Sequence, residues 1–167
     1  TIKQLKKEGI LFGISVCYTS KNVNDVTSDE FLDKMIASGV KYAFYFNFMP
    51  VGKNADKELI PTPSQRRFMY FWLKKMRNGK SGKPLFVMDF QDDGEYVGGC
   101  IAGGRNYFHV NSNGDMEPCV FIHYSDSNIR TDTLLEALQK PLFMAYRKGQ
   151  PFNDNHLRPC PMLENPE

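Results

Sequence analysis

The sequence predicts an α/β fold, in which a parallel sheet with crossover helices is followed by a small α+β module. Up to residue 90, short apolar runs alternate with helical patterns, and such alternation is typical of parallel strands joined by right-handed crossovers. A glycine-rich stretch at residues 98–104 ends this alternation. Beyond it, alternating polar and apolar residues flank the pair Asn113-Gly114, which indicates a β-hairpin.

The first predicted elements are a helix that ends before Gly9 and a strand over Ile10–Cys17. Gly9 suits the left-handed cap position of a helix. Thr27 and Glu30 form the Thr-x-x-Glu pattern of a capping box, which opens a second helix. We expect that helix to stop at Gly39.

Two more strands are predicted, over Tyr42–Phe48 and Leu85–Phe90, with a helix between them. Pro63 suits a first helical position, and the helical pattern runs to Arg77. This helix carries four large apolar side chains at helical spacing: Phe68, Phe71, Trp72 and Met76. Because the sequence starts within a helix, with no strand before it and no Met, we expect it to be part of a longer chain. Three parallel strands alone leave a sheet edge bare, so we expect missing neighbours or a second copy to pair there.

The second module is predicted as a hairpin followed by a helix. Residues 107–111 and 116–122 form its strands, and Asn113-Gly114 supplies the two positive φ angles of a type I′ turn. Thr131 or Asp132 caps the helix that follows.

Composition narrows the function. Apolar residues make up 41% of the chain and the formal net charge is +2, which excludes a disordered chain and gives no reason to expect a nucleic-acid or membrane partner. No apolar run approaches the roughly 20 residues that span a bilayer. The 4 cysteines are too few and too scattered for a disulfide-stapled secreted module. We therefore expect a soluble, cytoplasmic protein whose thiolates are available to a metal.

The cysteine spacing is the most informative pattern. Thirteen residues separate Cys100 from Gly114, four separate Gly114 from Cys119, and Cys160 follows alone. Folding the hairpin brings Cys100 and Cys119 toward one site, as metal ligation requires. The alternative is that each cysteine is a small buried apolar side chain.

The same residues resemble a known family. Gly99 to Gly104, and then His109 to Cys119 with Pro118 before the second cysteine, are similar to the auxiliary-cluster region of radical S-adenosylmethionine (SAM) enzymes, of the SPASM or shorter twitch type. That region begins with Cys-x(9–15)-Gly-x(4)-Cys. Asn128 resembles an asparagine that often follows in the family. The resemblance covers residues 95–162 and implies an auxiliary 4Fe-4S cluster held by three metal ligands: Cys100, Cys119 and Cys160.

The resemblance extends to the first half. Radical SAM cores are partial parallel (β/α)6 barrels, and residues 1–94 resemble their fourth to sixth strands, so that a barrel half is followed by the auxiliary module at residues 95–167. Ligands bind at the carboxyl ends of parallel strands, where hydroxyl and amide groups can bond a ribose or a carboxylate. The resemblance therefore implies that SAM is bound near five residues: Ser15, Thr19, Asn47, Met49 and Gly52.

Two departures from the family limit the prediction. The Cys-x(3)-Cys-x(2)-Cys motif that holds the SAM-cleaving cluster is absent from the sequence, so we expect this chain alone to be inactive and only a full-length parent to form a 5′-deoxyadenosyl radical. The second cysteine block of full SPASM domains is also absent, which predicts a single cluster. Its fourth ligand stays open among Cys17, His123, His156 and an iron that faces substrate.

Other interpretations remain. Cys100, Cys119 and Cys160 with His123 or His156 would make a structural zinc site, and the glycine-rich loop would suit a metal-free module that binds a peptide. The carboxylates after the third strand either relay a proton or cap turns: Asp89, Asp92 and Asp93. For the parent we expect a small-molecule or peptide substrate, no nucleic acid and no membrane, and self-association through the exposed barrel edge.

Overall fold

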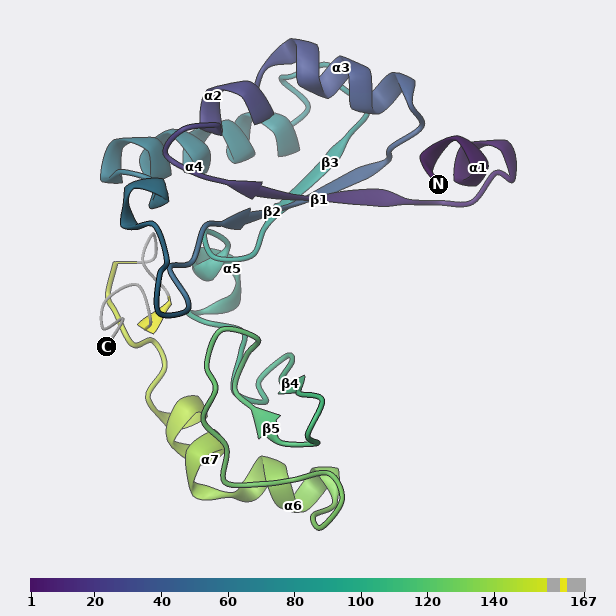
Figure 1. Cartoon of the computed structure of the whole chain (residues 1–167). Helices are drawn as coiled ribbons and strands as arrows, with labels where there is room; N and C mark the ends of the chain where they lie inside the picture. The colour runs from purple at the N-terminus through teal and green to yellow at the C-terminus, as the bar shows by residue number, and fades with distance from the viewer. Residues whose placement is uncertain (156–159, 162–167) are drawn as a thin grey trace. The chain divides into compact units, whose positions relative to one another are not determined.

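The computed structural model describes residues 1–155 and 160–161 of the chain. They divide into two compact units, Thr1–Asp93 and Gly94–Glu167, whose elements are labelled in Figure 1. Among the described residues there is no helix with the length and apolar character needed to cross a membrane.

The first unit is built on a three-stranded parallel sheet with strand order β1-β2-β3. The strands are β1 (Gly13–Tyr18), β2 (Tyr42–Asn47) and β3 (Phe86–Asp89), so the predicted parallel strands are confirmed. The first strand begins at Gly13 rather than at Ile10, because β1 pairs with β2 from the Gly13–Tyr42 position onward. Leu11, before that point, is 73% exposed.

Helices pack against one face of this sheet (Figure 1). They are α2 (Val23–Val26), α3 (Asp29–Ala37) and α4 (Pro63–Arg77). Helix α1 (Ile2–Lys7) lies beyond the start of β1, and the single-turn helix η1 (Lys57–Leu59) precedes α4. The predicted cap of α3 was wrong by one residue. Ser28 caps this helix by accepting a hydrogen bond from the Phe31 amide, whereas the Thr27 hydroxyl donates to the Val23 carbonyl at the end of α2.

The core of the first unit lies between the sheet and these helices. Helix α4 begins as predicted at Pro63, and Thr62 and Gln65 form a capping box around this start. Its inner face differs from the expectation, since Phe68 and Phe71 are 44% and 56% exposed. The side chains of α4 that are buried instead are Arg66, Met69, Trp72, Leu73 and Met76.

Adjacent residues of each strand face opposite sides of the sheet. On β2, Ala43, Tyr45 and Asn47 are buried beneath the helices, while Phe44 and Phe46 are partly exposed on the other side. Phe44 and Phe46 contact each other edge to face at 4.6 Å, and Phe46 stacks on Phe90 at 5.3 Å. The face away from the helices is thus lined by aromatic rings.

The second unit has shorter elements. They are α5 (Gly94–Val97), β4 (His109–Val110), β5 (Met116–Glu117), α6 (Leu134–Gln139) and α7 (Pro141–Lys148). Strands β4 and β5 pair antiparallel, which confirms the hairpin, although each strand is only two residues long.

The hairpin turn is not of type I′. No residue other than glycine has a positive φ angle among the described residues, so Asn113 has the ordinary sign, while Gly114 has φ +90°. The Gly114 amide donates to the Asn111 carbonyl, and the Asn111 amide donates to the Asp115 carbonyl. These bonds close a three-residue loop that ends in one left-handed glycine, and the Asn111 side chain, which accepts from the Asn113 and Asp115 amides, holds the loop.

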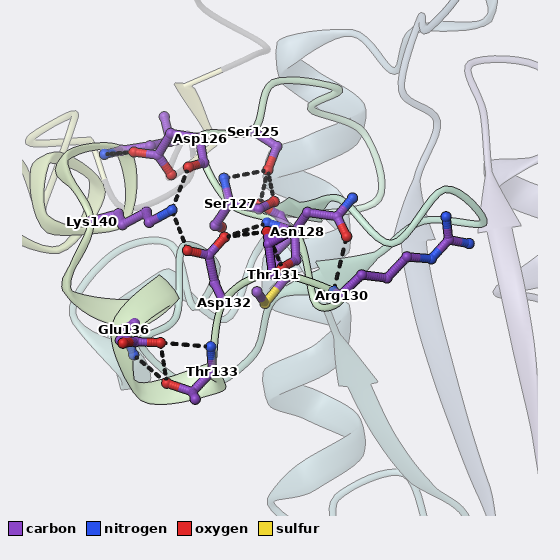
Figure 2. Close-up of polar contacts among 12 residues, drawn as sticks. Ser125, Asp126, Ser127, Asn128, Arg130, Thr131, Asp132, Thr133, Glu136 and Lys140 are labelled. Atoms are coloured by element: carbon purple, nitrogen blue, oxygen red, sulfur yellow. Dashed lines mark hydrogen bonds and ion pairs between the residues drawn. The ribbon is translucent and has the colours of Figure 1, made fainter.

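A polar network joins the segment after the hairpin to the two last helices (Figure 2). Thr133, with Glu136, forms the capping box of α6, so Thr131 and Asp132 are not the cap. Asp132 accepts a hydrogen bond from the Asn128 amide at 2.9 Å and contacts Lys140 Nζ at 2.5 Å. The carboxylate therefore ties the preceding turn to the end of α6 rather than starting that helix.

Candidate metal centre

Two of the predicted ligands, Cys100 and Cys119, lie in one apolar cluster of the second unit. Cys119 is 5% exposed and packs with Ala102 and Tyr146, and Cys100 contacts the same cluster. The Gly103 amide donates to the Pro118 carbonyl at 2.9 Å, which ties the loop after Cys100 to the residue before Cys119. The structure thus brings together two thiols that are separated by 18 intervening residues, and a backbone hydrogen bond joins the segments that carry them.

Both thiols are flanked by hydrogen-bond donors. Burial raises the pKa of the Cys100 thiol, and the Ala102 amide and the Tyr146 hydroxyl oppose this rise by donating to the sulfur. Burial also raises the pKa of Cys119, and the backbone amides of Phe121 and Ile122 beside the sulfur oppose this rise. Donors of this kind stabilise a thiolate, and a thiolate is the form that binds a metal.

Cys160 lies near the same place. Its side chain is partly buried. Burial is the main cause of the raised pKa of the Tyr146 hydroxyl, and the sulfurs of Cys100, Cys119 and Cys160 raise it further. Within residues 1–155 and 160–161, no three His, Cys, Asp or Glu side chains are gathered closely enough to hold a metal ion. The ligand role of Cys160 therefore stays a prediction.

Gly114 and Asn128, the glycine and the asparagine of the motif, lie in contact at the tip of the hairpin. A Cβ atom on Gly114 would lie 2.9 Å from the Asn128 Oδ1 atom and 3.2 Å from Ile129 Cγ2. The Asn128 side-chain Nδ2 atom donates to the Asn113 carbonyl and to Asp115 Oδ1. Because the asparagine side chain clamps the turn at close range, only glycine fits at its tip.

The possible fourth ligands lie in different surroundings. His123 Nδ1 is 3.6 Å from the Glu117 Oε2 atom, and His109 Nε2 is 4.0 Å from the same oxygen, so the described contacts of both imidazoles are with a carboxylate. Glu117 is 3% exposed and accepts a hydrogen bond from Asn111. Cys17 is exposed on β1 of the first unit, and His156 lies outside the described residues.

The predicted SAM-binding residues do not share one face of the sheet. Ser15 is exposed on the side away from the helices, whereas Asn47 is buried beneath them. The Thr19 hydroxyl accepts from the Lys21 and Asn22 amides, which is a local turn contact.

The last two predicted residues follow β2. Met49 is buried, and Gly52 lies in the loop with φ +96°. Asn47 stands out among the five, because both of its side-chain amide atoms are buried and have no hydrogen-bond partner in the part of the chain that the structure describes.

The carboxylates after β3 form ion pairs instead of an open catalytic pair. Asp92 accepts from Arg66 at 2.8 Å and from the Tyr18 hydroxyl at 2.8 Å, and Asp93 binds the Arg77 guanidinium through both oxygens. One oxygen of Asp89 accepts from the Gln91 and Asp92 amides, while burial raises the pKa of this carboxyl well above its ordinary value.

Four residues around these two clusters were not anticipated from the sequence: Tyr18, Arg66, Tyr107 and Tyr146. Arg66 sits among the polar positions of an amphipathic helix, and its burial depends on a partner 26 residues away. The two tyrosines that flank the thiols have no fixed spacing from the cysteines, so the sequence gives no signal for them.

Comparison with known proteins supports an iron-sulfur site. Residues 100–162 match the SPASM family, described as an iron-sulfur cluster-binding domain. Among curated proteins, no sequence matches this chain.

Solved structures share the fold. SuiB of Streptococcus suis bound to S-adenosylmethionine superposes with a TM-score of 0.63 at 17% identity, over 95% of this chain and 42% of SuiB. A second SuiB structure gives 0.60 at 16% identity, over 88% of this chain and 39% of SuiB. Native anSMEcpe with bound AdoMet and the Cp18Cys peptide gives 0.53 at 18% identity, over 84% of this chain and 43% of that protein.

The chain thus spans about two fifths of the length of the structures it matches. At these identities the likeness establishes the mixed α/β fold. Together with the domain match, it confirms the resemblance stated above: residues 100–162 match the SPASM iron-sulfur domain, and the chain resembles a radical SAM enzyme with a SPASM region.

Proposed function

We propose that this chain is the carboxyl-terminal part of a radical SAM enzyme and that its second unit holds an auxiliary 4Fe-4S cluster. The observation that carries the proposal is the placement of Cys100 and Cys119 in one apolar cluster, with the backbone amides of Ala102 and Phe121 beside their sulfurs. Cys160 lies near the Tyr146 hydroxyl, as Cys100 and Cys119 do, and it is the third ligand in this proposal.

The residues of the chain fit such a group. Thiolates are the protein ligands of iron-sulfur clusters, and a bound cluster supplies one-electron transfer over a range of potentials. Ala102, Phe121 and Ile122 pack against the thiols and exclude water from the sulfurs. The Ala102 and Phe121 amides lower the cost of the negative charge on Cys100 and Cys119, so this side of the site is organised before any metal arrives.

The first unit supplies part of a partial (β/α)6 barrel in this proposal. Its three parallel strands, with helices on one face, have the layering of a barrel wall. The aromatic face lined by Phe44, Phe46 and Phe90 is the surface that a barrel would enclose. Strands β1 and β3 are the edges of the described sheet, where the parent's other strands, or a second copy, would continue it.

The reaction proposed for the parent is reductive cleavage of SAM to a 5′-deoxyadenosyl radical, which abstracts hydrogen from a small-molecule or peptide substrate. The similar structures of SuiB and anSMEcpe were both determined with bound S-adenosylmethionine. Asn47 supports this role, because both of its side-chain amide atoms are buried and have no hydrogen-bond partner among the described residues. Ser15, Thr19, Met49 and Gly52 complete the proposed SAM-contacting set.

Anaerobic reconstitution with ferrous iron and sulfide tests the proposal. We expect the full chain to become brown and to retain iron and acid-labile sulfide. Replacing Cys100 and Cys119 together by serine should abolish both, because two ligands are lost. Cys17→Ser is the matched control, since Cys17 is an exposed thiol of the other unit, and it should leave the iron content unchanged.

Two results would contradict the cluster. A colourless protein that holds one zinc ion per chain would support the structural zinc site instead. Unchanged folding of the double serine variant, with no metal retained by the unmodified chain, would support a metal-free binding module.

A further inference from the structure

We infer that Gln150 is a positioning residue of the proposed cluster site: its side-chain oxygen holds the backbone of Cys100, and its side-chain nitrogen donates a hydrogen bond to the sulfur atoms of a bound cluster. The inference rests on the proposed function and deepens it. It assigns a role to a side chain that lies beside a metal ligand without being one.

The backbone of Cys100 is held by side chains on both sides of the residue. Its amide donates to Gln150 Oε1 at 3.0 Å, and its carbonyl accepts from Arg105 Nη1 at 2.5 Å. The other terminal nitrogen of the guanidinium, Nη2, donates to the Val97 carbonyl at 2.7 Å, so Arg105 also holds the segment that leads to the cysteine. Cys100 thus has a fixed backbone, which suits a residue whose sulfur must keep one place as a ligand.

Gln150 reaches Cys100 across a glycine. A Cβ atom on Gly99 would lie 2.5 Å from Gln150 Oε1 and 3.3 Å from Pro151 Cα, and Gly99 has φ +107°. A side chain at residue 99 would therefore push the glutamine amide away from the Cys100 amide. The close approach of Gln150 explains why a glycine comes directly before the cysteine.

The position of Gln150 is set by helix α7, which it follows almost directly. The Gly149 amide donates to a carbonyl of α7 at 2.9 Å and so ends the helix just before the glutamine. Phe152, two residues further on, packs edge to face on Tyr146 of the same helix at 4.9 Å. The chain is tied to α7 on both sides of Gln150, so a fixed backbone carries its side chain.

The side-chain nitrogen of Gln150 is buried and has no hydrogen-bond acceptor among the described residues. Only the oxygen of the amide can accept from the Cys100 N–H group, so that bond fixes which end of the amide is nitrogen. Because the two atoms belong to one planar group, the unpaired donor also lies close to Cys100. A buried donor without an acceptor destabilises a fold, and it therefore needs an explanation.

Sulfur atoms of a cluster bound at Cys100 are acceptors for this donor, since hydrogen bonds to the sulfurs are among the factors that set the potential of such groups. The Gln150 amide is uncharged at every pH, so it donates without adding a charge of its own. Reduction adds an electron, and a donor to sulfur stabilises the added negative charge. Removing the donor therefore shifts the midpoint potential to a more negative value.

The first test is a redox titration of the anaerobically reconstituted full chain, followed by electron paramagnetic resonance. We expect Gln150→Met, which keeps the length of the side chain and removes its donor, to shift the midpoint potential to a more negative value. Gln150→Glu keeps an acceptor for the Cys100 amide, so it should retain iron and sulfide and shift the potential in the same direction. Gln139→Met is the control, because Gln139 is exposed on α6, and it should leave the potential unchanged.

The second test needs no substitution. When the chain is labelled with nitrogen-15 only at the glutamine side-chain nitrogens, pulsed electron paramagnetic resonance of the reduced protein should show hyperfine coupling to that nucleus. The coupling should persist in Gln139→Met and disappear in Gln150→Met. A purely structural role of Gln150 would give no such coupling.

The outcomes separate this inference from the proposed function. Absence of the coupling, or equal potentials in the unmodified chain and Gln150→Met, would overturn the donor role while leaving the cluster in place. A negative shift in Gln150→Glu alone would reflect its added charge and would also overturn that role. Absence of iron and sulfide from the unmodified chain would overturn both proposals. If Gln150→Met fails to fold, the coupling in the unmodified chain decides.

Discussion

The two units of this chain bury apolar side chains on different scales. Residues 1–93 enclose a core of fourteen buried residues between a parallel sheet and its helices. The described part of the second unit divides its buried apolar residues between two clusters of three. Small domains with little buried apolar surface commonly need a metal or another cross-link. The three cysteines proposed as ligands lie in the second unit, which has the smaller apolar core.

The largest effect is expected from truncating the second unit's core. Phe143 is fully buried with Met116 and Ala137, and Phe143→Ala should cost about 3–5 kcal/mol. This loss is a large share of a domain's usual stability, so amide hydrogen exchange should show residues 94–155 opening while residues 1–93 stay protected. Equal loss of protection in both units would mean that they unfold together.

A smaller but still large effect is expected in the first unit. Arg66 and Asp92 form a buried ion pair, and Arg66→Met should cost about 3 kcal/mol because it leaves a buried carboxylate without its cation. Urea unfolding measures the loss. Replacing both residues, as Arg66→Met with Asp92→Leu, should recover much of it. A double variant no more stable than Arg66→Met would show that the loss does not come from an unpaired buried carboxylate.

Two glycines offer a matched test across the units. Gly114 and Gly52 have nearly the same φ, +90° and +96°, but a Cβ atom would meet Asn128 and Ile129 at Gly114 and nothing within 4 Å at Gly52. Gly52→Ala should cost about 1–2 kcal/mol from backbone strain alone, and Gly114→Ala should cost more. Thermal unfolding measures the stability of both variants. Equal losses of stability would show that the Asn128 side chain moves aside at little cost.

The smallest predicted effect is a difference in acid sensitivity. Hydrogen bonds from Asn128 lower the pKa of Asp115, Lys140 lowers that of Asp132, and the Thr133 amide lowers that of Glu136. A lowered folded-state pKa contributes stability above the ordinary value that is lost as pH falls below it. The second unit should therefore weaken below about pH 4.5, the highest ordinary value among these groups.

The first unit contains a carboxyl that responds in the opposite sense. Burial, with help from Asp92, raises the pKa of Asp89, so its contribution to stability is present at low pH and is lost as pH rises. Hydrogen exchange at about pH 7 and about pH 4 should show residues 94–155 losing more protection on acidification than residues 1–93. The reverse order would contradict this assignment.

Local patterns accounted for much of the fold. The start of α4 at Pro63 and the antiparallel hairpin follow from rules that act within a few residues. The errors in the helix caps arose where several residues that can cap a helix follow one another. Ser28 caps α3 in place of Thr27, and Thr133 caps α6 in place of Thr131 or Asp132. The type I′ turn failed because a single glycine and the Asn111 side chain suffice for a longer loop.

The site was only partly predictable for a different reason. Cys100 and Cys119 were found because a hairpin lies between them, and a hairpin has a local signature. The burial of Arg66 and the approach of Tyr146 to Cys100 depend on tertiary packing, which leaves no pattern at short range. Asn47 was predicted at a strand end, but its position beneath the helices was not.

The hydrogen bond from Gly103 to Pro118 has a consequence for the order of assembly. It closes the chain between Cys100 and Cys119 on itself, and this closure requires nothing from the tail that contains Cys160. During synthesis, the half-site with two thiols can form as soon as the hairpin leaves the ribosome. Cys160 leaves the ribosome later, so the closure between Cys100 and Cys119 does not wait for it.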